Sequence, residues 1–205
     1  MPTALRPPPP DLDRIAPLER PFSTAEYRRL AEAGVLGPDS RVELIDGRIV
    51  AMSPILPPHL HTLRRLTDLL AKRLYASDAA PAQMLIQSSF ALQDGTEPEP
   101  DLILLRPDAP EDRLPEPRDV VLVVEVSDST LRYDQTVKRA RYAQAGVPET
   151  WVLDVAARAV EVGREPHGRG YRQVPRLEEG AAVDVAALPG LPPLPVSDLF
   201  PPASP

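Results

Sequence analysis

Apolar residues recur along this chain with two different periods, one typical of helices and the other of strands. Leucines recur at helical spacing among basic residues from position 60 to 76, which predicts an amphipathic helix with a basic polar face. A second helix is predicted at residues 134–145, because a glycine and then a proline follow it. A short helix is predicted at residues 25–33, with Ser23 or Thr24 as its N-cap.

The remaining apolar stretches predict a hairpin and a set of strands. Residues 41–52 predict the hairpin, because Asp46-Gly47 separates two apolar runs. The mostly β-branched run at 120–126 is typical of a strand buried on both faces. Further strands are predicted at 83–92, 101–105, 150–154, 159–162 and 171–174. We therefore expect an α/β fold of the mixed α+β type, in which helices flank a central mixed sheet.

Proline is the compositional outlier, with 28 among 205 residues. Seven prolines fall within residues 1–21 and seven within 189–205. Both ends are expected to be extended or disordered, because proline lacks a backbone N–H and restricts its predecessor. We expect one domain at residues 22–200, with proline-rich tails at 1–21 and 201–205.

Several classes of chemistry are excluded by what the chain lacks. It contains no cysteine, which rules out disulfides, thiol nucleophiles, thiolate zinc sites and iron–sulfur clusters. It has no glycine-rich phosphate loop, dinucleotide fingerprint, nucleophile elbow or H-E-x-x-H motif. The apolar runs are too short for a signal peptide or a membrane span, so we expect a cytoplasmic protein without membrane contact. The net charge of −7 argues against a protein that coats nucleic acid nonspecifically, although a local basic groove is compatible with it.

Two acids lie at strand ends where a charge is costly. Asp101 begins the apolar run after Pro100, and Glu125 lies within the buried run at 120–126. A carboxylate in a buried strand needs a partner, a metal or a shifted pKa. On neighbouring strands, these two side chains would form an oxygen-rich site suited to Mg²⁺ or Mn²⁺. The backbone carbonyl of Val126 would add a third oxygen.

A lysine lies in the helix that follows the Glu125 strand. Lys138 comes four residues after Asp134 and four before Tyr142, so the three share one helix face. If this face covers the strand end, the ammonium reaches a metal-bound water or a scissile phosphate. There it would orient the nucleophile and offset developing charge. The metal would lower the pKa of the water and polarise the phosphoryl oxygen.

These stretches also carry a resemblance to a known family. The chain resembles the Uma-type restriction endonucleases, a branch of the PD-(D/E)XK nuclease superfamily. The similar stretches are VELIDGRIVAMSP at 42–54, His59, EPD at 99–101 and VVEVSDSTLRYDQTVKRARYAQAGVPETWVLD at 123–154. They cover most of the region from about 40 to 160, and the last of them is the specific one.

The resemblance implies a restriction-endonuclease-like fold with a divalent-metal site. Asp101, Glu125 and Lys138 match the expected triad, with Glu43 as an additional acid and His59 near the site. The superfamily motif would place lysine at position 127, where Ser127 stands, so Lys138 takes its role from the next helix. The implied activity is Mg²⁺-dependent hydrolysis of phosphodiester bonds in DNA. Cutting both strands needs two sites, which makes a homodimer plausible.

Each of these residues also has an ordinary structural interpretation. Asp101 suits a strand start after proline, and Glu125 suits an ion pair with an arginine. Lys138 suits a solvated helix face, and Glu43 suits a cross-strand partner of a basic residue. For Asp134, helix capping is the interpretation that we favour.

A rival function belongs to a different class. The domain retains the nuclease fold but binds a protein or nucleic-acid partner without catalysis. The charge of −7 supports this alternative, because duplex DNA is itself strongly negative. A nuclease acting on RNA or on branched DNA is a third alternative that the sequence does not separate from the first.

Overall fold

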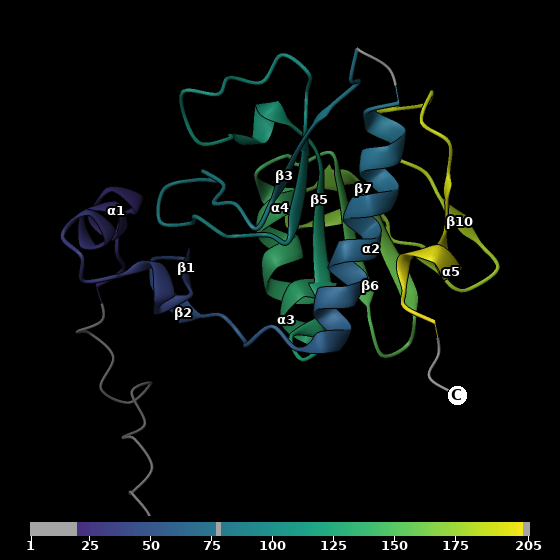
Figure 1. Cartoon of the computed structure of the whole chain (residues 1–205). Helices are drawn as coiled ribbons and strands as arrows, with labels where there is room; N and C mark the ends of the chain where they lie inside the picture. The colour runs from purple at the N-terminus through teal and green to yellow at the C-terminus, as the bar shows by residue number, and fades with distance from the viewer. Residues whose placement is uncertain (1–19, 77–78, 203–205) are drawn as a thin grey trace, which may run out of the picture.

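The computed structural model describes residues 20–76 and 79–202 of the chain (Figure 1). Its centre is a seven-stranded mixed sheet with the order β3-β4-β5-β6-β7-β8, and β9 pairs with β7. β5 and β6 are parallel, whereas the other neighbours are antiparallel. The strands are β3 (Gln83–Ile86), β4 (Leu102–Leu105), β5 (Val120–Ser127), β6 (Glu149–Asp154), β7 (Ala159–His167), β8 (Gly170–Gln173) and β9 (Arg176–Leu177).

Helical segments cover both faces of this sheet. The main ones are α2 (Pro57–Leu74), α3 (Leu131–Tyr133), the π-helical segment η4 (Asp134–Lys138), α4 (Arg139–Gln144) and α5 (Val196–Leu199). A further helix, α1 (Thr24–Glu32), lies to one side of the sheet (Figure 1). Two short 3₁₀ turns are η2 (Pro38–Ser40) and η3 (Pro117–Asp119). Within the described residues, no helix combines the length and the apolar character needed to cross a membrane.

The alternation of side chains along β4 and β5 separates two cores. Leu104 and Leu122 face the leucines of α2, whereas Ile103 and Val123 pack with Tyr142 of α4 on the other face. Because side chains two residues apart share a face, Glu125 lies on the same side as Val123. The acid therefore faces the segment that contains η4 and α4.

A separate hairpin lies beside the sheet, next to α1 (Figure 1). It consists of β1 (Val42–Ile45) and β2 (Arg48–Ala51), joined at Asp46 and Gly47 as the sequence predicted. Leu44 exchanges backbone hydrogen bonds with Glu97, which connects β1 to the segment before β4. At its turn, Asp46 forms an ion pair with Arg141 of α4. These contacts bring the hairpin to the α4 side of the sheet.

Several predicted boundaries are wrong for identifiable reasons. α2 begins three residues early, because Pro57 is favoured in the first turn of a helix. β3 ends at Ile86 rather than at residue 92, because Gln87 adopts a left-handed backbone with φ of 45°. The helix predicted to begin at Asp134 begins at Leu131. α1 is close to its prediction, and Ser23 is its N-cap within a capping box.

The proline-rich C-terminal stretch is more ordered than the sequence predicted. β10 (Ala182–Val183) pairs with β11 (Leu194–Pro195), and α5 follows directly. Apolar residues between the prolines enter the core on the α2 side; they are Leu191, Leu194, Val196, Leu199 and Phe200. The expectation of an extended or disordered end is therefore wrong up to residue 200. The tail predicted at 1–21 lies outside the described residues except for its last two positions, and that at 201–205 is described only at its first two.

Candidate active site

The pairing of β4 with β5 places two acids opposite each other. Leu102 pairs with Val124, so Asp101 and Glu125 lie one position further along on the two strands. Both are buried, with 9% and 4% of their surface exposed. The backbone N–H of Val126 donates to Oδ2 of Asp101 at 2.8 Å, which anchors the first acid to the strand of the second. The two carboxylates predicted from sequence are therefore brought together.

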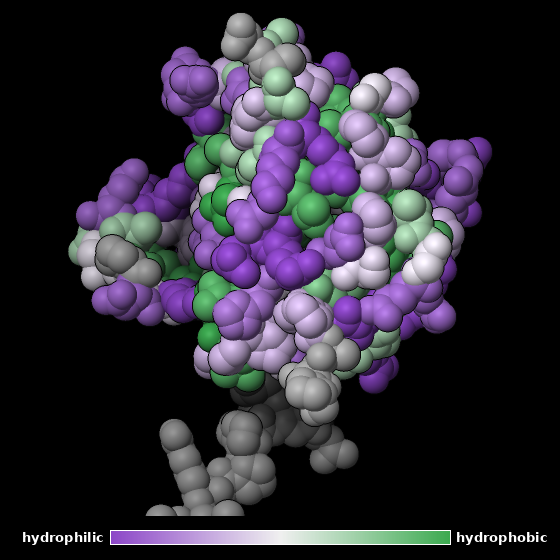
Figure 2. All heavy atoms as spheres, turned by 45° about the vertical axis from the view of Figure 1, so that its right-hand side comes forward, coloured by the Kyte–Doolittle hydropathy of each residue, from purple (hydrophilic) through white to green (hydrophobic). Residues whose placement is uncertain are grey.

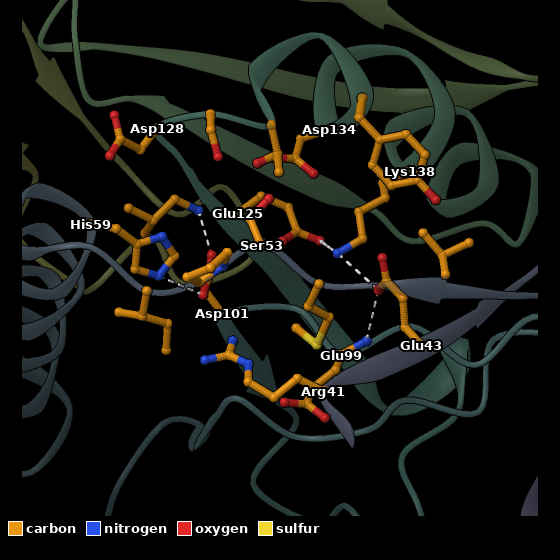
Figure 3. A pocket seen from close by; sticks show the side chains of 18 of the residues that line it. Arg41, Glu43, Ser53, His59, Glu99, Asp101, Glu125, Asp128, Asp134 and Lys138 are labelled. Atoms are coloured by element: carbon orange, nitrogen blue, oxygen red, sulfur yellow. Dashed lines mark hydrogen bonds and ion pairs between the residues drawn. The ribbon is translucent and has the colours of Figure 1, made fainter. Parts of the chain in front are cut away.

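A buried lysine bridges one of these acids and the hairpin. Nζ of Lys138 lies 3.0 Å from Oε2 of Glu43 and 3.1 Å from Oε1 of Glu125 (Figure 3). Tyr142 donates its hydroxyl proton to the same Glu125 oxygen at 2.5 Å. Oε1 of Glu125 thus accepts two donors from the helical segment. Among the described residues, no hydrogen bond reaches its other oxygen.

The π-helical segment η4 explains how Lys138 reaches the sheet. A π-turn is wider than an α-turn, and such turns recur at functional sites. Both Asp134 and Lys138 are buried on the sheet side of η4. Asp134 does not join the lysine, however, but accepts hydrogen bonds from Ser127 at 2.8 Å and Thr130 at 2.6 Å. Through these two hydrogen bonds, Asp134 holds the loop after β5. It is not the helix N-cap, because the helix begins before it at Leu131.

His59 lies in the first turn of α2 and faces Asp101. Its Nε2 atom is 3.0 Å from Oδ1 of Asp101, yet it has no aligned hydrogen bond within the described chain. Burial lowers the pKa of His59, but the Asp101 carboxylate and the Val126 carbonyl outweigh this effect, so the net shift is upward. The interaction is therefore close and electrostatic, and the ring nitrogen remains poorly satisfied.

Burial and mutual repulsion dominate the electrostatics of these acids. Burial raises the pKa of Glu125 well above its usual value, and Lys138 only partly offsets this effect. Burial opposes the charge on Lys138, but Glu125 and Glu43 outweigh it and raise the lysine pKa. Lys138 therefore stays protonated, and its single positive charge is shared by the two carboxylates of Glu43 and Glu125. Burial also raises the pKa values of Glu99 and Asp134. The site therefore favours an added positive charge.

All of these groups open into one pocket of about 190 Å³, which is lined by both strand ends, β2, α2 and η4 (Figure 3). A water molecule takes about 30 Å³ of liquid, so the pocket has room for a hydrated cation. Six carboxylates line it: Glu43, Glu99, Asp101, Glu125, Asp128 and Asp134. Two cationic side chains, Arg41 and Lys138, line it as well.

Some of these lining residues were missed by the sequence interpretation. Glu99 precedes Asp101 by two residues, and this spacing from a residue already singled out was the available signal. Arg41 offered no such signal, because its left-handed backbone departs from the alternation of side chains along a strand. Tyr133 also lines the pocket, where burial raises its pKa to about 12 and its hydroxyl finds no partner among the described residues.

The residues present fit a hard divalent cation that keeps part of its water shell. In the described part of the chain, no three histidine or carboxylate side chains are grouped closely enough to enclose a metal ion. Mg²⁺ does not require such a cage, because it commonly uses one or two carboxylates and completes its shell with water and substrate oxygens. Asp101 and Glu125, with the Val126 carbonyl, provide that donor chemistry.

Paired acids and a lysine at the end of a mixed sheet, with helices on both faces, are typical of a nuclease-like fold. The comparisons agree. The chain belongs to the Uma2 family, described as "Putative restriction endonuclease", whose model matches residues 24–197. It is also similar to a crystal structure of a putative nuclease belonging to DUF820 from Anabaena variabilis. That likeness has a TM-score of 0.68 at 15% identity and covers 88% of this chain and 98% of the other, so it shows the fold alone. No curated protein gives a significant match.

Proposed function

We propose that this protein is a metal-dependent endonuclease that hydrolyses phosphodiester bonds in DNA. One observation carries the proposal: Asp101, Glu125 and Lys138 come from three different elements and converge on one pocket. Converging polar groups with perturbed pKa values in a cleft are the expected mark of an active site. Membership of the Uma2 family supports the same class of reaction.

The proposed roles follow from the contacts of each residue. Asp101 and Glu125, with the Val126 carbonyl, would hold Mg²⁺ or Mn²⁺, which would supply a water of lowered pKa and polarise the phosphoryl oxygen. Lys138 would orient the attacking water and offset charge on the phosphate. Glu43 would keep the Lys138 ammonium in place, which it contacts at 3.0 Å. His59 would orient Asp101 from α2.

Two further parts of the proposal concern assembly and location. Cleavage of both DNA strands needs two active sites, so we propose that the protein is a homodimer. We also propose that it acts in the cytoplasm. Size-exclusion chromatography with light scattering distinguishes a dimer from a monomer. Duplex, branched and RNA substrates in the same cleavage assay would reveal which nucleic acid is hydrolysed.

The test is plasmid nicking by the purified protein in Mg²⁺, in Mn²⁺ and in EDTA. Glu125→Ala and Lys138→Ala are expected to lower the rate by at least about 100-fold, the scale of losing one charge-stabilising group. Asp119→Ala is the matched control, because Asp119 is a buried acid that is paired with Arg113 and does not line the pocket. Metal-dependent nicking that survives in Glu125→Ala would contradict the proposal.

One observation favours the rival, a non-catalytic nuclease-fold domain that binds a protein or nucleic-acid partner. The Lys138 ammonium and the Tyr142 hydroxyl both donate to Oε1 of Glu125, so protein groups already satisfy this carboxylate oxygen. A Mn²⁺ titration separates the two functions. An active metal site binds Mn²⁺ with an affinity that Asp101→Asn weakens, whereas the rival predicts no Mn²⁺ binding by either protein.

A further inference from the structure

Arg41 occupies an unusual backbone position at the edge of the pocket. It directly precedes β1 and has φ 42° and ψ 65°, in the left-handed region that bulky side chains avoid. Its carbonyl accepts the N–H of Met52 at 2.9 Å, which closes the open end of the hairpin. Strained backbone held by surrounding structure is often found at functional sites.

The Arg41 side chain is half-buried and lines the pocket beside the acids. Figure 3 shows it near Glu99 and Asp101, on the side of the pocket away from Asp134. Within the described residues, its guanidinium forms no hydrogen bond or ion pair. Lys138, by contrast, is held by both Glu43 and Glu125. Arg41 is therefore the pocket cation that is not committed to a protein partner in the described chain.

A phosphodiester group that enters this pocket meets six carboxylates. Its negative charge needs a donor that is still available after Lys138 has been used by the protein. An arginine suits this role, because its planar fork can donate two parallel hydrogen bonds to phosphate oxygens. We propose that Arg41 binds the substrate phosphodiester anion at the mouth of the acidic pocket. This inference rests on the proposed function, since it names the residue that admits an anionic substrate.

A simpler role for Arg41 is to neutralise Glu99. Burial raises the pKa of Glu99, and Arg41 is the largest influence that lowers it. In that case, removal of Arg41 would alter stability and leave affinity for nucleic acid unchanged. The two roles therefore differ in what a binding measurement reports.

The test uses the full-length protein and a fluorescein-labelled DNA duplex. Binding is measured by anisotropy in Ca²⁺, and KM and kcat are measured by nicking in Mg²⁺. The variant Arg41→Asn removes the charge with a residue that tolerates left-handed backbone, and Arg41→Lys keeps the charge without the fork. Arg64→Ala is the control, because Arg64 is an exposed arginine of α2 outside the pocket.

We expect Arg41→Asn to raise Kd and KM by about 10-fold or more and to lower the salt slope of binding by about one. Arg41→Lys should fall between Arg41→Asn and the parent, and Arg64→Ala should stay within about twofold. If the parent cuts DNA and Arg41→Asn matches Arg64→Ala in both constants, the inference is wrong and the nuclease proposal stands. If the parent binds DNA through Arg41 without cutting it, the inference holds and the nuclease proposal falls. A parent that neither binds nor cuts DNA overturns both.

Discussion

Tyr142 donates a hydrogen bond of 2.5 Å to Oε1 of Glu125, across the contact between α4 and β5. Both side chains are almost completely buried. The same oxygen receives Lys138, so the helical segment holds one carboxylate oxygen and leaves the other toward the pocket. Tyr142 packs in a hydrophobic core, but this contact also makes it part of the candidate site.

Removing this hydroxyl should affect both stability and metal binding. Tyr142→Phe should lower the free energy of unfolding by about 1.5–3 kcal/mol, because the lost hydrogen bond is to a charged group. It should also weaken Mn²⁺ binding by about 10-fold, the lower end of the effect seen when an outer partner of a metal ligand is lost. Urea denaturation and electron paramagnetic resonance of Mn²⁺ measure the two effects.

Tyr171→Phe is the matched control for this substitution. The Tyr171 hydroxyl donates to the neutral carbonyl of Val147 at 2.9 Å and does not line the pocket. Tyr171→Phe should lower the free energy of unfolding by about 1 kcal/mol and leave the affinity for Mn²⁺ unchanged. Equal Mn²⁺ affinities of Tyr142→Phe and the parent would show that Tyr142 has only a packing role.

Lys138→Met should be among the most destabilising substitutions in the pocket. It leaves Glu43 and Glu125 buried without their shared cation, a change that typically costs about 3–5 kcal/mol. Adding Glu43→Gln should recover part of this loss, because one uncompensated carboxylate is removed. Urea denaturation of the parent, both single variants and the double variant forms a complete cycle. Strictly additive effects would be incompatible with the bridging contact.

The ion pair between Asp46 and Arg141 should make stability depend on pH at the acid end. The hydrogen bond from Arg141 lowers the pKa of Asp46 in the folded protein. The pair therefore contributes stability above the ordinary aspartate pKa of about 3.9, and the contribution is lost as pH falls through the lowered folded value. Asp46→Asn should lack this component.

Thermal unfolding between about pH 2 and 7 measures the difference between the parent and Asp46→Asn. Asp108→Asn is the control, because Asp108 is an exposed acid in the loop after β4. The stability difference between the parent and Asp46→Asn should shrink at acid pH. A difference that stays constant across the range would exclude the pair as its source.

Glu149 is a buried acid with a structural role outside the pocket. It accepts the Trp151 indole N–H at 2.7 Å, Arg164 at 3.0 Å and the backbone N–H of Ala186 at 2.8 Å. Glu149→Ala should lower the free energy of unfolding by about 1–3 kcal/mol, because the buried indole N–H loses its acceptor, whereas Arg164 keeps its ion pair with Asp184. Folded protein at low temperature should keep the parental nicking rate. Tryptophan fluorescence reports the unfolding, and a lost rate in folded protein would place Glu149 in the site after all.

The elements were predictable where the local pattern was strong. The capped helix after Ser23, the hairpin at Asp46-Gly47 and the apolar strand before Glu125 are all present. The order of the proline-rich C-terminal stretch was not predicted, because its many prolines indicated an extended chain although the apolar residues between them occupy the core. The π-helical segment was also missed, because its wider turn comes from packing on the sheet and has no local sequence signal.

The candidate site was predictable only in part. Asp101 and Glu125 were found because a charge next to apolar strand residues is costly, and Lys138 because of its helical spacing. Tyr142 was placed on the helix face of Lys138, but its hydrogen bond to Glu125 was not predicted. Arg41 was overlooked, because nothing in the sequence around it distinguishes a pocket arginine from a surface one.

By itself, the sequence determined the mixed class of fold, the buried strand with an acid in it and the absence of thiol chemistry. These properties depend on composition and on patterns within about ten residues. Only the tertiary structure decided that Asp101 lies opposite Glu125, that Glu43 approaches Lys138 from a separate hairpin and that Arg41 keeps its charge available. Such contacts join segments that are remote in the chain. They are set by sheet register and by the burial of both core faces, which no local pattern specifies.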